Sequence, residues 1–215
     1  MTYLDIVNNI LKRLRERTVA SVEESIYSRL IGVLVNDAKS TIEESWQWSA
    51  LRTTLTATTE ADVFNYVLTG TNNNFTTLDV LNDTDDFFLQ YATAHDMNGK
   101  FLTGTPSTGT PTEYSFNGVD AVGDTQVDLY PIPDGVYTVR FNVVMRNPEL
   151  SGDADVLLIP TQPVLLLAYA LAVEERGEDG GINPASAYNR AQVALSDAVA
   201  HDAQKHLEET IWYES

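Results

Sequence analysis

The sequence predicts an α+β protein: a helical bundle, with its N- and C-terminal helices packed together, and an inserted small antiparallel β-sandwich or barrel. Two changes of hydrophobic period predict this order. Helix-like spacing covers residues 3–50, strand-and-turn spacing covers 51–147, and helix-like spacing returns over 163–212. We therefore expect a discontinuous helical bundle domain formed by residues 1–50 and 151–215, and an inserted β domain formed by residues 51–150.

Composition and charge exclude several classes of function. The chain has 215 residues, of which 43% are hydrophobic and 20% charged, as is typical of a globular protein. Its 13 Lys and Arg against 31 Asp and Glu give a net charge of −18, which disfavours nonspecific binding to phosphates or to an anionic membrane. The absence of cysteine excludes disulfides, thiolate metal sites and cysteine nucleophiles. We find no signal peptide, and the apolar run 164–173 is about half the length needed to cross a bilayer, so we expect a soluble protein with no membrane contact.

Two helices are expected in the first fifty residues. The first has apolar residues at three- and four-residue steps, Leu4, Val7, Leu11 and Leu14. Basic residues follow it (Lys12, Arg13, Arg15 and Arg17), and we interpret them as a solvated face, with an acidic partner as the alternative. For the second helix, Ser21 and Glu24 predict a capping box. Its expected buried stripe extends to about Ala50 and comprises Val22, Ile26, Leu30, Val33, Leu34, Ile42 and Trp46. Trp46 and Trp48 are expected to seal the base of the core.

The middle of the chain predicts five or six short strands. The candidates are residues 51–59, 64–68, 75–81, 87–91 and 137–145, with one helical turn within 94–101. The 137–145 segment alternates apolar and polar residues, which indicates a half-buried strand. The turn at Pro131–Gly135 predicts a hairpin that pairs this strand with a segment containing Val127 and Leu129.

Two further helices are expected after residue 160. Residues 164–173 are apolar on every side, which predicts the central helix of the bundle, and the charges and glycines of 174–181 end it. Asn183-Pro184 predicts the N-terminus of the last helix. Its expected buried stripe is Tyr188, Ala191, Leu195, Ala198 and Leu207.

No motif in the sequence predicts catalysis or metal binding. The adjacent glutamates Glu23-Glu24, Glu43-Glu44, Glu174-Glu175 and Glu208-Glu209 point about a hundred degrees apart on a helix, which favours surface charge over a catalytic pair. His201 and His206 have the wrong spacing for a shared metal. The Asp-rich segments 83–86 and 153–155 lack the glycine and closing glutamate of an EF-hand, which favours turns. We therefore expect a protein that is not an enzyme and has no catalytic, cofactor or metal site.

Several segments resemble, in order and spacing, the head-to-tail adaptor (connector, or head-completion) proteins of tailed bacteriophages. The resemblance covers nearly the whole chain. It rests on Glu44-Ser45-Trp46-Gln47-Trp48, on Thr53–Thr59 followed by Phe64–Leu68, on Leu89-Gln90-Tyr91 followed by Gly109–Tyr114, on Leu129–Tyr137 with its continuation to Leu150, and on Leu158-Ile159-Pro160 with the helix that follows to Glu175.

The resemblance implies a structural virion protein in the neck, between the capsid portal and the tail, made in the host cytoplasm. Such a protein forms a homo-oligomeric ring, typically of twelve copies, that docks under the portal protein and offers an attachment surface to a tail tube or nozzle protein. Double-stranded DNA passes through the ring without specific binding. The segment implied to bind the portal is Thr210, Ile211, Trp212, Tyr213, Glu214 and Ser215; the alternative is a free end with Ile211 packed on its own helix.

Two other functions stay open at this point. The first is a β-sandwich recognition module of a tail fibre or carbohydrate-binding protein, with a binding face drawn from Phe64, Tyr66, Phe87, Phe88, Tyr91, Tyr114 and Phe116. Packing of these rings in the strand core is the favoured interpretation. The second is a hydrolase that uses aspartate pairs from the β loops.

Overall fold

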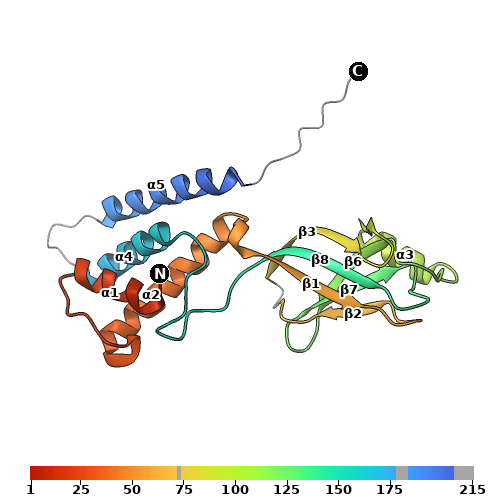
Figure 1. The fold of residues 1–215 in the computed structure, drawn as a ribbon, viewed down its shortest axis with the longest axis horizontal. Coiled ribbons are helices and arrows are strands. Elements are labelled where there is room, and N and C mark those ends of the chain that lie inside the picture. Colours follow the sequence, from red (N-terminus) through yellow and green to blue (C-terminus); the bar gives the residue numbers. More distant parts are fainter. Residues whose placement is uncertain (72–73, 178–183, 206–215) are drawn as a thin grey trace, which may run out of the picture. The chain divides into compact units, whose positions relative to one another are not determined.

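The computed structural model describes residues 1–71, 74–177 and 184–205, which form five α-helices and two four-stranded sheets (Figure 1). Two compact units account for the chain: a helical unit, Met1–Leu51 with Asn147–Ser215, and a β unit, Arg52–Arg146. In the helical unit the N-terminal helices α1 and α2 contact the C-terminal helix α4, and α4 contacts α5. The predicted α+β fold, in which the helices from both ends of the chain pack together, is confirmed.

Helix α1, Tyr3–Arg13, begins at a capping box. Thr2 accepts a hydrogen bond from the Asp5 amide, and the Asp5 carboxylate accepts one from the Thr2 amide. Hydrogen bonding from the Thr2 side chain, and then from its amide, lowers the pKa of Asp5. The predicted apolar face is buried at Val7 and Leu11, together with Tyr3, Ile6 and Ile10. The capping box and the apolar face together fix where this helix starts and which side it packs.

Helix α2, Ile26–Ser45, is shorter than predicted at both ends. Ser21 caps a separate 3₁₀ turn, Val22–Glu24, and the α-helix begins at a second cap, Ser25, whose hydroxyl accepts from the Ser28 amide. At the other end Trp46 is extended, and Ser49–Leu51 forms another 3₁₀ turn. The prediction missed these breaks because serine at a cap and serine within a helix look alike in a hydrophobicity pattern.

The buried face of α2 also differs from the predicted stripe. Ile26 and Val33 are 81% and 56% exposed, so two of the residues expected in the core lie on the outer side of the helix. The face that packs in the bundle consists of Ser28, Ile31, Gly32, Val35, Ala38, Lys39, Ile42 and Glu43. Five of these eight residues are small or charged, and the apolar pattern therefore did not reveal them.

Gly32 is required by the packing of α1 on α2. A Cβ atom at this position would lie 2.3 Å from Tyr3 Oη and 3.0 Å from Val22 Cγ1, and Tyr3 is buried. We expect Gly32→Ala to lower the free energy of unfolding by about 1–3 kcal/mol through overpacking. The measurement is urea unfolding followed by tryptophan fluorescence. Adding Tyr3→Phe removes the closest atom and should recover most of the loss; an unchanged loss would show that overpacking against Tyr3 is not the cause.

Helices α4, Thr161–Arg176, and α5, Pro184–Ala203, complete the helical unit. Helix α4 contacts α1, α2 and α5, which confirms its predicted central position. It ends at Gly177, whose left-handed backbone (φ 57°) suits a glycine C-cap. Helix α5 buries Ala187 and Ala191 and half-buries Tyr188, Leu195 and Ala198, whereas Leu207 lies outside the described residues.

The β unit is a sandwich of two four-stranded sheets with one core between them. One sheet has the order β1-β8-β3-β4 and the other β2-β7-β6-β5; their pairs are antiparallel except β5–β6. Val127, Leu129, Val139, Phe141 and Val143 are fully buried in the shared core. The strands are β1 Arg52–Thr58, β2 Asn65–Leu68, β3 Phe75–Asn82, β4 Phe87–Phe88, β5 Gln90–Tyr91, β6 Glu113–Val119, β7 Thr125–Tyr130 and β8 Thr138–Met145.

The predicted hairpin between β7 and β8 is wrong. Strand β7 pairs with β2 and β6, while β8 pairs with β1 and β3 in the other sheet, so Pro131–Gly135 carries the chain from one sheet to the other. Thr59 holds this crossover, since its hydroxyl donates to Gly135 O at 2.9 Å and accepts from the Tyr137 amide at 2.8 Å. Two alternating strands joined by a short turn look the same in sequence whether they pair in one sheet or belong to two stacked sheets. The pattern therefore does not distinguish a hairpin from a crossover.

The predicted helical turn is the nine-residue helix α3, Ala94–Leu102.

Candidate assembly surfaces

The segment implied to bind the portal, Thr210–Ser215, lies outside the described residues. The element that precedes it in the described chain is helix α5. Helix α5 ends at Ala203, and the described chain ends at Lys205. The last turn of α5 is therefore the nearest part of the helical unit in sequence that the structure describes.

Asp202 fixes the end of α5 to the turn that follows α2. Its Oδ2 accepts from Trp46 Nε1 at 3.1 Å and from the Ser49 amide at 2.9 Å, and its Oδ1 accepts from Ser49 Oγ at 2.6 Å. Lys205 Nζ lies 3.1 Å from Oδ1, and Asp202 itself is buried. A buried carboxylate with several donors from a distant segment is a strong positional restraint. We call Trp46, Ser49 and Asp202 the α5 anchor.

The sequence contained a signal for this anchor. Asp202 continues the predicted α5 stripe, because it follows Leu195 by seven residues and Ala198 by four. A carboxylate on an otherwise apolar face indicates a buried acceptor, although nothing in the sequence names its donors. Trp48 seals the core as predicted: it is fully buried, and its Nε1 donates to Ile42 O at 2.8 Å.

A second buried charge holds the other end of the β insertion. Lys39 Nζ lies 3.1 Å from Glu43 Oε1 and donates to Asn147 O at 2.8 Å. Both charged residues are buried, so the interpretation of Glu43-Glu44 as surface charge is wrong for Glu43. The spacing of four residues on the packed face of α2 explains why the two meet. Ser49 and Asn147 flank the β unit in sequence, and a buried charge therefore fixes the helical unit at each point where the chain leaves it and returns.

The basic residues in the last turn of α1 and just after it form few ion pairs among the described residues. Lys12, Arg15 and Arg17 are exposed and form no ion pair among the described residues. Glu16 pairs with Arg176 at 2.8 Å, and Arg176 also donates to Leu14 O and lies over the Tyr27 ring. These contacts hold together the ends of α1 and α4 and the start of α2. An acidic partner for the free cations stays a prediction.

The acidic segments of the chain serve as hydrogen-bond acceptors. Asp83 pairs with Arg140 at 2.6 Å, and backbone hydrogen bonds from Gly152 and Ser151 lower the pKa of Asp155. Between α4 and α5, the Tyr188 hydroxyl donates to Glu174, and burial together with this hydrogen bond raises the pKa of Tyr188 to about 12.

The part of the chain that the structure describes contains no group of three or more His, Cys, Asp or Glu residues that are placed to hold a metal ion.

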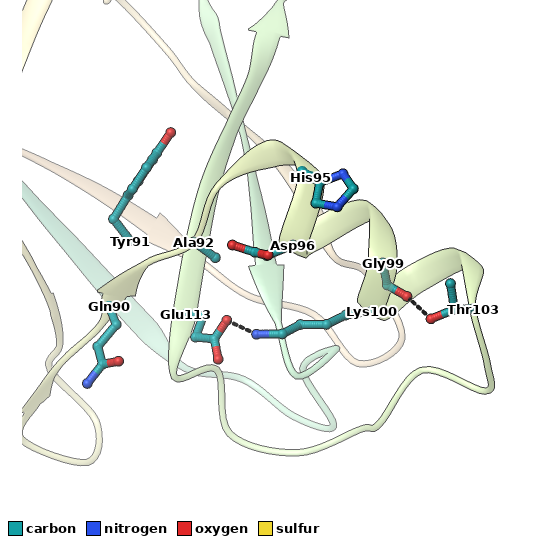
Figure 2. A pocket seen from close by; sticks show the side chains of 9 residues that line it. All are labelled: Gln90, Tyr91, Ala92, His95, Asp96, Gly99, Lys100, Thr103 and Glu113. Atoms are coloured by element: carbon teal, nitrogen blue, oxygen red, sulfur yellow. Dashed lines mark hydrogen bonds and ion pairs between the residues drawn. The ribbon is translucent and has the colours of Figure 1, made fainter.

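The β unit has a hollow of about 470 Å³ between β5 and α3 (Figure 2). Lys100 extends from α3 to Glu113 on β6, and the two form an ion pair. Asp96 accepts from Thr93, which caps α3. Lys100, Glu113 and Asp96 thus each have a partner, and His95 is exposed. This arrangement supplies neither a nucleophile with a base nor a set of metal ligands.

The predicted aromatic face is divided by the structure. Tyr114 is buried in the sandwich core, and Tyr66, Phe87 and Phe116 pack against it, as the core interpretation expects. Phe88 and Tyr91, on the short strands β4 and β5, are 66% and 59% exposed, and Phe64 is also exposed. The core interpretation therefore holds for Tyr66, Phe87, Tyr114 and Phe116, and it is wrong for the exposed rings of Phe64, Phe88 and Tyr91.

Comparison with known proteins agrees with this architecture. A family model described as SU10 adaptor protein matches residues 1–208. No curated protein matches the chain. None of the described helices is long and apolar enough to span a membrane. The match bears out the resemblance to phage head-to-tail adaptors, which are structural proteins not known as enzymes. The chain belongs to the SU10 adaptor protein family.

Proposed function

We propose that this adaptor forms a ring, of twelve copies, which docks under the portal protein in the virion neck and extends the DNA channel towards the tail. The observation that carries the proposal is the family match over residues 1–208, in a chain whose two ends form a single helical unit. The ring is made in the host cytoplasm and becomes part of the virion. A tail tube or nozzle protein binds its other side.

The two units of the chain take different parts in this proposal. The helical unit corresponds to the bundle domain and forms the ring. The β unit is the inserted domain and presents a surface to the tail. Support comes from the chain topology, because the insertion leaves and re-enters the helical unit at two fixed points, Ser49 and Asn147. A side domain attached in this way can vary without disturbing the ring.

The acidic charge suits a channel for DNA. Each copy carries −18, and a ring multiplies that charge around the lumen. Binding to DNA depends on the cations that a protein offers to phosphates. A lumen lined by carboxylates lets the duplex move through without specific binding, and ejection of the genome needs such movement.

The C-terminal segment is proposed to dock on the portal. Its apolar residues Ile211, Trp212 and Tyr213 come eight to ten residues after Ala203, the end of a helix that Asp202 holds in place. A fixed starting point reduces the conformational freedom that the segment loses on binding. The segment is thus proposed as an arm with an ordered base.

Deletion of Thr210–Ser215 tests the proposed function. We expect the truncated chain to unfold at the same urea concentration as the full chain, because the α5 anchor stays intact, and to bind purified portal at least about tenfold more weakly. Sedimentation of each chain with portal measures the binding. The control is the double substitution Gln192→Ala and Ser196→Ala on exposed positions of α5, which should bind as the wild type does. A stable full-length monomer without affinity for portal would contradict the ring, and unfolding of the truncated chain would contradict the role of the segment.

A recognition module is the second candidate, favoured by the exposed rings of Phe88 and Tyr91. Such rings can stack on sugars or on an apolar partner. In this case the purified chain binds a cell-surface polysaccharide with or without portal. Replacing both rings with alanine distinguishes the two functions, because it abolishes sugar binding but leaves docking on the portal unchanged.

A further inference from the structure

The outer side of α2 has an apolar surface that no described residue covers. Ile26, Leu30, Val33 and Asp37 follow one another at three- and four-residue steps, and we call them the α2 outer stripe. Ile26, Val33 and Asp37 are exposed, and Leu30 is half-buried. Helix α2 therefore has apolar residues on two sides, whereas a bundle helix needs them on one. Apolar residues in line on a solvent-facing helix indicate a contact with another molecule.

Helix α5 has a groove along one flank. The hollow has a volume of about 610 Å³ and is completed by Gln162 at the start of α4. Small and apolar side chains, Ala185, Ala194 and the 62% exposed Val193, form much of its wall. Arg190 and Asp197 supply its charges. A groove with small residues at helix spacing admits another helix at close range.

The stripe and the groove belong to two different helices that both pack on α4. Helix α4 contacts both α2 and α5 and lies between them in Figure 1. Two different surfaces of a protomer form a heterologous contact, which generates a closed ring when the rotation between copies closes. The arrangement fits a second copy of this chain as the partner of each surface.

The α5 anchor sets the relative height of the two surfaces. It joins the end of α2 to the end of α5, and both helices contact α4, so positions along each helix can be counted from a common end. Val33 precedes Trp46 by thirteen residues, and Asn189 precedes Asp202 by thirteen. At 1.5 Å per residue, both lie about 20 Å from the anchored end. Copies in a ring are related by rotation alone, so equal heights face each other when the axis lies along these helices.

Charge complementarity selects the same alignment. Asp37 lies about 14 Å and Arg190 about 18 Å from the anchored end, a difference that the long arginine side chain can span. Arg190 lies in the groove, Asp37 lies in the stripe, and neither forms an ion pair among the described residues. A chain with a net charge of −18 that associates with itself needs a cation opposite each interfacial carboxylate.

We propose that the α2 outer stripe of one copy packs into the α5 groove of the next, with Val33 beside Asn189 and Asp37 paired with Arg190, and that this contact closes the ring. The inference rests on the proposed ring and adds the surfaces that build it. Leu30 and Val33 lose their exposure to water in the contact, and the ion pair fixes the register.

Engineered disulfides test the contact directly, because the chain has no cysteine of its own. Val33→Cys with Asn189→Cys places one thiol on each surface at equal height. Mild oxidation of portal-bound rings should give a reducible ladder of multimers in denaturing gels. The matched control, Ser40→Cys with Asn189→Cys, displaces the first thiol by seven residues, about 10 Å along the same outer side. A disulfide needs Cα atoms within about 7 Å, so the control should remain monomeric in the gel.

Charge exchange gives an independent readout. Asp37→Arg should raise the concentration needed for half-assembly at least about tenfold, since it places two arginines together. Adding Arg190→Asp should restore assembly to within about threefold of the wild type. Rings that form normally but yield no ladder, or a double exchange without rescue, overturn this contact and leave the proposed function intact. A wild-type chain that forms no ring on portal overturns both.

Discussion

Replacing Lys39 with methionine should lower the free energy of unfolding of the helical unit by about 3–5 kcal/mol. The substitution keeps most of the apolar volume but removes the Lys39 ammonium from beside the buried Glu43 carboxylate. It also removes the donor at 2.8 Å from Asn147 O. Tryptophan fluorescence during urea unfolding measures the loss without a signal from the β unit, because residues 52–146 contain no tryptophan.

The double variant Lys39→Met, Glu43→Leu separates charge burial from packing. Removing both charges should recover most of the loss, because an apolar pair needs no desolvated ions. Asp37→Asn, on the exposed side of the same helix, is the control and should change stability by less than about 0.5 kcal/mol. A single variant as stable as the wild type would show that Glu43 is not confined to the interior.

Asp202→Ala should destabilise the helical unit by about 2–4 kcal/mol, because Trp46 Nε1, the Ser49 amide and Ser49 Oγ lose their acceptor together. The same urea titration measures this loss. Amide hydrogen exchange should also rise in the last turns of α5, since the helix end is no longer held. Asp197→Ala, one and a half turns earlier and exposed, is the matched control and should leave both measurements unchanged. Exchange that stays slow in Asp202→Ala would show that other contacts hold the helix end.

The sequence predicted the elements of this fold better than it predicted their faces. The apolar run in α4 is compatible only with a buried helix, and the alternation in β8 only with a half-buried strand. Both elements form as expected. Helix α2 has apolar residues on two sides, so periodicity alone could not decide which side enters the bundle. The true core face contains Gly32 and the ion pair of Lys39 with Glu43, which an apolar pattern counts as surface.

The candidate site was predicted only where it depends on local sequence. Trp48 is bulky and apolar, and its position in the core followed from that alone. Asp202 binds residues more than 150 positions away, and pairing at that distance depends on tertiary packing. The crossover at Pro131–Gly135 shows the same limit, because a turn in the sequence does not state which sheet the next strand joins. The structure adds the contacts between residues that are far apart in the sequence.

Strands β1 and β8, through which the chain enters and leaves the β unit, are neighbours in one sheet and pair from Arg52↔Val144 to Thr58↔Thr138. A mechanical load between the β unit and the helical unit therefore acts on two adjacent strand ends in the same direction. Such a load is divided between two covalent tethers and does not peel one strand from the other. The hydrogen bonds that pair β8 with β3 oppose such a load in shear, which suits the proposed attachment of the tail to the β unit.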